Sequence, residues 1–195
     1  TNTSYLISPA GKILGTQSQT HLNRDERGCG FVCGEDLRVF ATSLGDLGFA
    51  ICEDAWYPEV MRILTLKGAR IIIAPTAVPK PYSMWHQVRG MWQNIQQNQV
   101  FGIESCLVGF LGGVEFEGRS AIYAPCDMTP EDTGMLEQAK APHMEDVFTH
   151  DLDFDKLKET IVGFDIFSRF NIPLYKEWFP DLYRQAVAGR PQSYK

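Results

Sequence analysis

Short apolar runs recur along the chain, and turn residues such as Gly, Pro, Asn and Asp separate them. Runs of this length between turn signals are typical of strands, whereas the segments at 58–67 and 85–99 place apolar residues on one helical face. The alternation predicts an α/β or α+β fold with a mixed sheet, with helices on one face and a second sheet on the other. Strands are predicted at 5–7, 13–15, 37–43, 49–52, 70–74, 100–110, 120–124 and 147–152, and a third helix at 155–162.

Turn chemistry sets several of these boundaries. Pro58 stands at the first position of its helix, where proline is favoured, and Gly68 follows as a natural stop. Residues 23–36 are polar and glycine-rich, which predicts a surface loop, and residues 127–137 are also predicted to be loop. The aromatic-rich tail from Phe164 is predicted to be irregular.

Length and charge narrow the classes of function. The chain has 195 residues, a length that suggests one domain with a proper core. The net charge is -6 and no cluster of Lys and Arg stands out, so nucleic acid and anionic membranes are not expected as partners. No apolar run reaches the roughly 18 residues of a membrane-spanning helix. We expect a cytoplasmic protein.

The five cysteines are an odd number, so they cannot all pair within the chain. We expect reduced thiols, as in cytosolic proteins. Cys29 and Cys33 are four residues apart, but no second pair has zinc-finger spacing. A metal site that combines them with a distant His is the weaker alternative, and no metal or organic cofactor is expected.

Cys52 is the strongest candidate for chemistry. It ends a predicted buried strand, and Pro58 opens a helix six residues later. A thiol there is held on rigid scaffold at the strand edge, where backbone N–H groups can stabilise an oxyanion. A thiolate in such a place is an effective nucleophile. Spacing alone leaves open a purely structural role for Cys52. Cys is among the most buried residue types, so Cys52 could simply pack in the core.

The segment Ile51-Cys-Glu-Asp-Ala-Trp-Tyr-Pro-Glu59 resembles the nucleophile region of the nitrilase (carbon–nitrogen hydrolase) superfamily. Other matches follow in the family's order: Thr20-His21-Leu22, Arg62 to Ala69, Ala74-Pro-Thr-Ala77, Gln97-Asn-Gln-Val-Phe101, Phe116-Glu-Gly-Arg-Ser120, Ala124-Pro125 and, more weakly, Phe179-Pro-Asp-Leu-Tyr183. The resemblance implies an αββα sandwich with mixed sheets and helices outside, which usually forms dimers or larger assemblies. It also implies hydrolysis of an amide, carbamoyl or nitrile through a Cys nucleophile, a Glu general base, a Lys and often a second Glu.

The chain departs from the family pattern at two of these positions. Gln19 stands where the resemblance places the lysine, and an amide can donate to an oxyanion but carries no charge. The general-base Glu of the family lies upstream of the segment matched here, so we expect that base to come from outside this chain. Glu26 matches the second glutamate approximately, and a solvated loop carboxylate is its alternative interpretation.

Three residues near Cys52 are weaker candidates for the oxyanion site or pocket. Glu53 is expected to contribute its backbone N–H rather than its side chain. Tyr57 could line a substrate pocket. Glu59 is expected in the first turn of a helix, where the helix dipole favours a carboxylate whether or not it has a function.

The leading hypothesis is therefore hydrolysis of a small amide or nitrile, amide before nitrile, with Cys52 as nucleophile. The alternative is a catalytically impaired nitrilase-like scaffold or binding subunit. It is motivated by Gln19 at the lysine position and by the general base, which is expected to come from outside this chain. An unrelated redox-sensing α/β protein is a third, weaker hypothesis. Residues 1–195 are expected to form the C-terminal two-thirds of one nitrilase-like domain, which would assemble as a homo-oligomer and need a companion N-terminal segment or chain.

Overall fold

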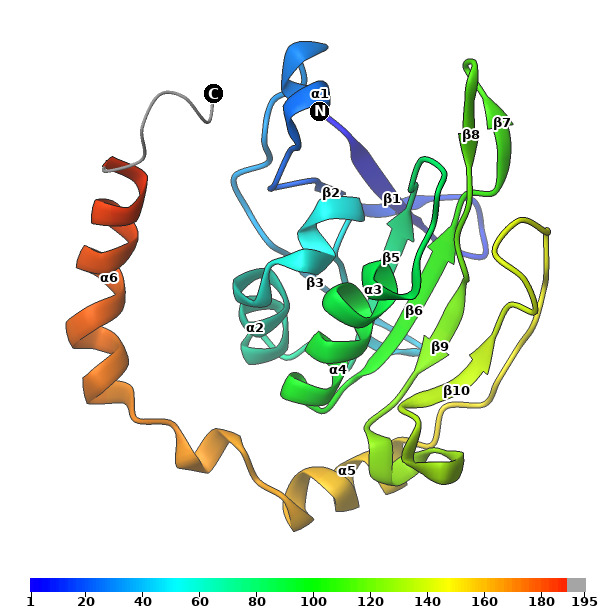
Figure 1. Ribbon diagram of the computed structural model, residues 1–195. Coiled ribbons are helices and arrows are strands. Elements are labelled where there is room, and N and C mark those ends of the chain that lie inside the picture. Colours follow the sequence, from blue (N-terminus) through cyan, green and yellow to red (C-terminus); the bar gives the residue numbers. More distant parts are fainter. Residues whose placement is uncertain (189–195) are drawn as a thin grey trace. The chain divides into compact units, whose positions relative to one another are not determined.

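The computed structural model describes residues 1–188 (Figure 1). The chain divides into two compact units, Thr1–Thr160 and Ile161–Lys195. The first unit contains both α-helices and β-sheets, and the second contains the helix α6, Ile172–Ala188. None of the helices among residues 1–188 is long and apolar enough to cross a membrane.

A six-stranded mixed sheet forms the centre of the first unit, in the order β10-β9-β6-β5-β4-β3. The three central strands β4, β5 and β6 are parallel to one another, and β3, β9 and β10 each pair antiparallel with a neighbour. The carboxyl ends of β4, β5 and β6 therefore meet at one edge of the sheet. The bounds are β3 Val39–Thr42, β4 Gly45–Phe49, β5 Ile71–Thr76, β6 Phe101–Cys106, β9 Ala121–Tyr123 and β10 Met135–Gln138.

Helices cover one face of this sheet, as the apolar periodicity predicts (Figure 1). They are α2 (Pro58–Leu66), α3 (Met84–Gln87), the π-helical turn η2 (Val88–Trp92) and α4 (Gln93–Asn98). The helices approach the sheet closely because two strand positions are glycine. A Cβ on Gly48 would lie 3.0 Å from Leu64, and one on Gly102 would lie 2.8 Å from Ile95.

A two-stranded antiparallel sheet, β1 (Thr3–Ile7) with β2 (Ile13–Ser18), accompanies the six-stranded one. Gly15 of β2 lies against the ring of Phe40 in β3, which places this hairpin beside the edge strand of the larger sheet. The hairpin confirms the return of the chain predicted at 13–15. The α/β class with mixed sheets and helices is likewise confirmed.

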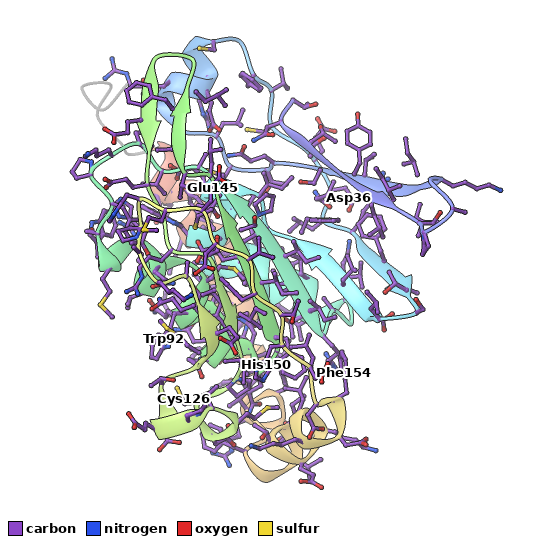
Figure 2. The ribbon with its side chains drawn as sticks, turned by 90° about the vertical axis from the view of Figure 1, so that its right-hand side faces the viewer. Asp36, Trp92, Cys126, Glu145, His150 and Phe154 are labelled. Atoms are coloured by element: carbon purple, nitrogen blue, oxygen red, sulfur yellow. The ribbon has the colours of Figure 1, made fainter. Side chains whose placement is uncertain are left out.

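Phe154 begins the helix α5, Phe154–Gly163, which confirms the helix predicted at 155–162. Its ring meets Phe101 edge to face, with centroids 5.4 Å apart. Figure 2 shows Phe154 at the end of the sheet away from the hairpin of β7 (Gly109–Leu111) and β8 (Val114–Phe116). This contact covers the end of the sheet at which the parallel strands begin. The opposite end, where these strands finish, is not covered by it.

Several sequence predictions were wrong in detail. The run 100–110 divides into β6 and β7, which begins at Gly109 with a left-handed φ of 99°. Gly112 and Gly113, with φ values of 60° and 82°, form the turn that joins β7 to β8. Residues 147–152 form no strand, and the predicted loop 127–137 contains the start of β10. The tail predicted to be irregular contains α6 instead.

The helix predicted at 85–99 is also interrupted. Gly90 leaves helical geometry at φ -83° and ψ -112°, and the indole of Trp56 packs against it, 3.2 Å from where a Cβ would stand. Asn94 bridges the interruption, donating to the carbonyls of Gly90 at 3.0 Å and Ala55 at 2.9 Å. The apolar period shows one helix, whereas this bend follows from a contact with a distant segment.

Candidate active site

Cys52 lies just beyond the carboxyl end of β4, and not inside the strand as the sequence suggested. β4 ends at Phe49, and Cys52 begins a 3₁₀ turn, η1 (Cys52–Trp56). Its φ is +50°, a left-handed conformation that is uncommon for a residue with a side chain. Backbone strain of this kind clusters at functional sites because the surrounding structure must hold it.

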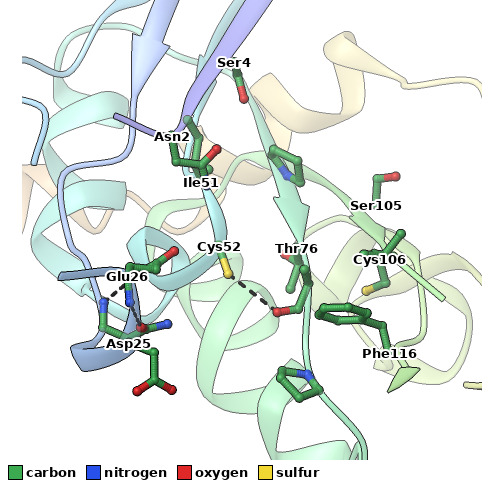
Figure 3. A pocket seen from close by; sticks show the side chains of 15 residues that line it. Asn2, Ser4, Asp25, Glu26, Ile51, Cys52, Thr76, Ser105, Cys106 and Phe116 are labelled. Carbon is green, nitrogen blue, oxygen red and sulfur yellow. Dashed lines mark hydrogen bonds between the residues drawn. The ribbon is translucent and has the colours of Figure 1, made fainter. Parts of the chain in front are cut away.

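The thiol of Cys52 lines a cavity of about 670 Å³ at the carboxyl edge of the parallel strands. This is the position at which open α/β sheets bind their ligands. Figure 3 shows the sulfur of Cys52 between Glu26 on one side and Thr76 and Phe116 on the other. The lining residues are Asn2, Ser4, Asn23, Asp25, Glu26, Ile51, Cys52, Pro75, Thr76, Ala77, Pro79, Ser105, Cys106, Leu107 and Phe116.

The surroundings of Cys52 keep its thiol protonated. Burial raises the pKa of Cys52, and the negative charges of Glu26 and Glu53 raise it further. Hydrogen bonding with the backbone at Ala77 and at Glu53 acts in the opposite direction, and Sγ lies 3.8 Å from the Ala77 carbonyl oxygen. Among the described residues that line the cavity there is no lysine or arginine. The thiol therefore needs a base to become a nucleophile.

Glu26 reaches the cavity from a short helix, α1 (Arg24–Gly28). Asn23 caps this helix: its side chain accepts from the Glu26 backbone N–H at 2.9 Å, and its own N–H donates to Glu26 Oε2 at 2.8 Å. These reciprocal bonds hold the carboxylate next to the thiol (Figure 3). Part of the predicted surface loop is thus the element that brings Glu26 and Cys52 together.

Gln19 is fully buried, and its side-chain amide is occupied. Nε2 donates to the His21 carbonyl at 2.7 Å and to Glu26 Oε2 at 3.3 Å, while Oε1 accepts from Asn2 at 2.8 Å. Both amide hydrogens thus have acceptors, which leaves neither for an oxyanion in this conformation. The geometry assigns Gln19 to holding Glu26 in place.

Of the remaining predicted residues, Glu53 lies closest to the chemistry. Hydrogen bonding with its backbone lowers the pKa of the Cys52 thiol, and burial together with Glu26 raises the pKa of its own carboxyl. Tyr57 stacks on His21 with ring centroids 3.8 Å apart. Glu59 lies in the first turn of α2. Neither Tyr57 nor Glu59 is among the described residues that line the Cys52 cavity. The first-turn position of Glu59 is the one expected from the helix dipole, and a pocket role for Tyr57 stays a prediction.

Asp54 is a buried residue of this region that sequence reasoning missed. Its carboxylate accepts from the backbone N–H groups of Thr20, His21 and Ile51 at 2.8 to 3.3 Å. It also accepts from the Thr20 hydroxyl at 2.7 Å, and it lies 3.2 Å from Nδ1 of His21. The only signal in the sequence is its place two residues after Cys52, because its partners Thr20 and His21 are more than 30 residues away.

Comparisons with known proteins give the family and the fold of the chain. The sequence model of the family "Carbon-nitrogen hydrolase" matches residues 1–161. The chain belongs to the carbon–nitrogen hydrolase family. A protein of Schizosaccharomyces pombe named as a probable nitrilase is 29% identical over 96% of this chain and 63% of its own length. The N-carbamoylputrescine amidase of Solanum tuberosum is 29% identical over 76% of this chain and 49% of its own length.

Solved structures show the same fold. An amidase from Nesterenkonia sp. AN1 has a TM-score of 0.68 at 21% identity, covering 90% of this chain and 62% of its own. In a mutant of that amidase, the acetamide moiety of fluoroacetamide is added covalently at the active-site cysteine; that structure has a TM-score of 0.63 at 22% identity, covering 72% of this chain and 51% of its own. This carbon–nitrogen hydrolase chain therefore spans less than two thirds of the length of these relatives.

This family member also carries a buried acidic residue behind the cavity, which the sequence analysis missed. Glu104 of β6 is 8% exposed, and Oε2 accepts from the Tyr123 hydroxyl at 2.6 Å. Burial raises the pKa of Glu104 to about 7. Cys106, two residues along the same strand, lines the cavity, and burial together with the charge of Glu104 raises the pKa of its thiol.

Proposed function

We propose that this chain contributes the nucleophile for hydrolysis of the carbon–nitrogen bond of a small amide. The observation that carries the proposal is the Cys52 thiol, held in a left-handed turn at the carboxyl edge of the parallel strands and facing a cavity that Glu26 also lines. The cysteine that reacts with fluoroacetamide in the Nesterenkonia amidase supports it. So does the presence of amidases among the relatives.

The reaction follows from these groups. A base takes the proton of the Cys52 thiol, and the sulfur attacks the carbonyl carbon of the amide. The tetrahedral intermediate collapses as the carbon–nitrogen bond breaks, and the nitrogen leaves with the proton as ammonia or an amine. Water then attacks the thioester, which releases the carboxylic acid and restores the thiol. The negative charge on the carbonyl oxygen forms next to the Glu53 backbone N–H, which provides a hydrogen-bond donor.

Two parts of the mechanism remain open to experiment. We propose that residues outside this chain supply the general base, and that Glu26 occupies the place of the family's second glutamate. The cation that the family uses is replaced by Gln19, which binds Glu26. The alternative, a scaffold without activity, gains no support from the comparisons. A homo-oligomer, a companion N-terminal segment and a cytoplasmic location stay predictions.

The test uses the full-length protein and a panel of small aliphatic and carbamoyl amides, with the corresponding nitriles for comparison. Ammonia release is measured, and intact mass spectrometry detects the acyl adduct and the thioether that fluoroacetamide forms. We expect Cys52→Ala to lower turnover by at least roughly 1000-fold and to remove both adducts. Cys126→Ala removes a partly buried thiol outside the cavity and serves as the matched control. Turnover that survives in Cys52→Ala, or its absence from the wild type with every amide, overturns the proposal.

A further inference from the structure

We propose that Asp54 is a positioning residue, which imposes the left-handed turn at Cys52 and sets the thiol at a fixed place relative to Glu26. This inference rests on the proposed function for its meaning in catalysis, but its geometry can be tested without turnover. It goes beyond the family match, because it concerns contacts that this chain makes between two segments more than 30 residues apart.

The first step is local. The Asp54 backbone N–H donates to the Ile51 carbonyl at 3.0 Å, while the Ile51 N–H donates to Asp54 Oδ2 at 3.3 Å. These two bonds close a ring whose intervening residues are Cys52 and Glu53. The ring bends the backbone at Cys52 to a φ of +50°. A non-glycine residue in that conformation is strained, so it persists only where neighbouring bonds hold it.

The second step links distant segments. Asp54 Oδ1 accepts from the Thr20 hydroxyl at 2.7 Å and from the His21 N–H at 2.8 Å. His21 in turn accepts the Gln19 amide through its carbonyl, and the same amide donates to Glu26. A continuous series of hydrogen bonds therefore runs from the Cys52 turn to the carboxylate on the other side of the thiol.

The third step is burial. Asp54 is 0% exposed, so its carboxylate depends on these donors in place of water. A buried carboxylate that accepts from three backbone N–H groups and one hydroxyl is costly to disturb, and each bond to a charged group contributes more than a neutral one. Asp54 does not line the cavity among the described residues, so it acts through Cys52 and Glu26 rather than on the substrate.

The test is a double-mutant cycle on the pH dependence of Cys52 alkylation by iodoacetamide, followed by mass spectrometry. Because the charge of Glu26 raises the pKa of Cys52, Glu26→Gln should move the alkylation midpoint to lower pH in the wild-type background. If Asp54 sets the distance between the two groups, the same substitution should move the midpoint by less than half as much in Asp54→Asn. An unchanged effect of Glu26→Gln in the folded Asp54→Asn protein overturns the proposal.

Two further variants keep the test decisive. Thr20→Val removes one hydroxyl donor but leaves the Asp54 carboxylate. We therefore expect it to reduce the midpoint shift caused by Glu26→Gln by less than Asp54→Asn does. If Asp54→Asn fails to fold, the result with Thr20→Val decides the outcome alone. Asp36→Asn removes an exposed carboxylate that pairs with Arg38 and Lys67, and it should leave the cycle unchanged. Amide turnover is measured in parallel, with a fall of roughly 10- to 100-fold in kcat at constant KM expected for Asp54→Asn. The two proposals can fail separately. If the wild type hydrolyses none of the amides but the effect of Glu26→Gln on the alkylation midpoint still falls in Asp54→Asn, the proposed function is overturned and the role of Asp54 stands.

Discussion

The buried carboxyl of Glu104 gives the sharpest quantitative prediction. It lies on the helix-covered face of β6, next to the Tyr123 hydroxyl, with a pKa of about 7 against an ordinary value of 4.5. Burial is the main cause, and the hydrogen bond from Tyr123 acts in the opposite direction. The perturbation is Glu104→Gln, which keeps the shape of the side chain and can still accept from Tyr123, but cannot ionise.

The sign follows from which state releases the proton first. Below pH 4.5 the carboxyl is protonated in both the folded and the unfolded chain, so it imposes no pH dependence. Between pH 4.5 and about 7 the unfolded chain ionises while the folded chain does not, and the free energy of unfolding falls as the pH rises. Two pKa values that differ by about 2.5, at about 1.36 kcal/mol for each unit, make this loss about 3 kcal/mol. The other groups next to Glu104 do not add to the change, because the pKa values of Tyr82, Cys106 and Tyr123 all lie above their ordinary values.

The assay is urea unfolding, followed by tryptophan fluorescence, at several pH values from 4.5 to 8. Each free energy of unfolding for Glu104→Gln is compared with that of the wild type at the same pH, which cancels the other titrating groups. We expect the variant to gain about 3 kcal/mol relative to the wild type across this range. Tyr123→Phe should extend the loss of stability to higher pH and so enlarge it, because the Tyr123 hydroxyl holds the pKa of Glu104 down. Glu115→Gln removes a half-exposed carboxylate and is the matched control. A difference between Glu104→Gln and the wild type that stays constant with pH would refute the reasoning.

Three further substitutions test the site and the packing. Gln19→Lys should place a cation beside Glu26, lower the pH at which Cys52 is alkylated and raise amide turnover about tenfold or more; unchanged turnover would show that the missing charge is not limiting. Gly102→Ala should lower the free energy of unfolding by about 1–3 kcal/mol in denaturant titrations, because the added Cβ meets Ile95 at 2.8 Å, and full stability would contradict the tight packing. Asn94→Ala leaves the buried carbonyls of Gly90 and Ala55 without the Asn94 donor, and it should lower the free energy of unfolding by about 1–3 kcal/mol. An unchanged denaturant midpoint would contradict this prediction.

The site was only partly visible in the sequence, and the reason is distance along the chain. Cys52 stands out because strand, thiol and Pro58 are adjacent in sequence, and the family resemblance added Glu26 and Gln19. Asp54 could not be assigned in the same way, since its partners at Thr20 and His21 come from a separate segment. The sequence offered Tyr57 as a residue that could line the pocket, and only the fold shows that its ring stacks on His21, from a segment more than 30 residues away.

The amino-acid sequence by itself determined the local elements: apolar alternation specified most strands of the sheet, and Pro58 and Gly68 bounded a helix as expected. These features depend on neighbours a few residues apart, so they can be recognised without the fold. Tertiary structure decided the bend at Gly90, which packs against Trp56 of a distant segment, 3.2 Å from where a Cβ would stand. It also decided the environment of the Cys52 thiol, because burial and the charge of Glu26 act through space between segments that only folding brings together.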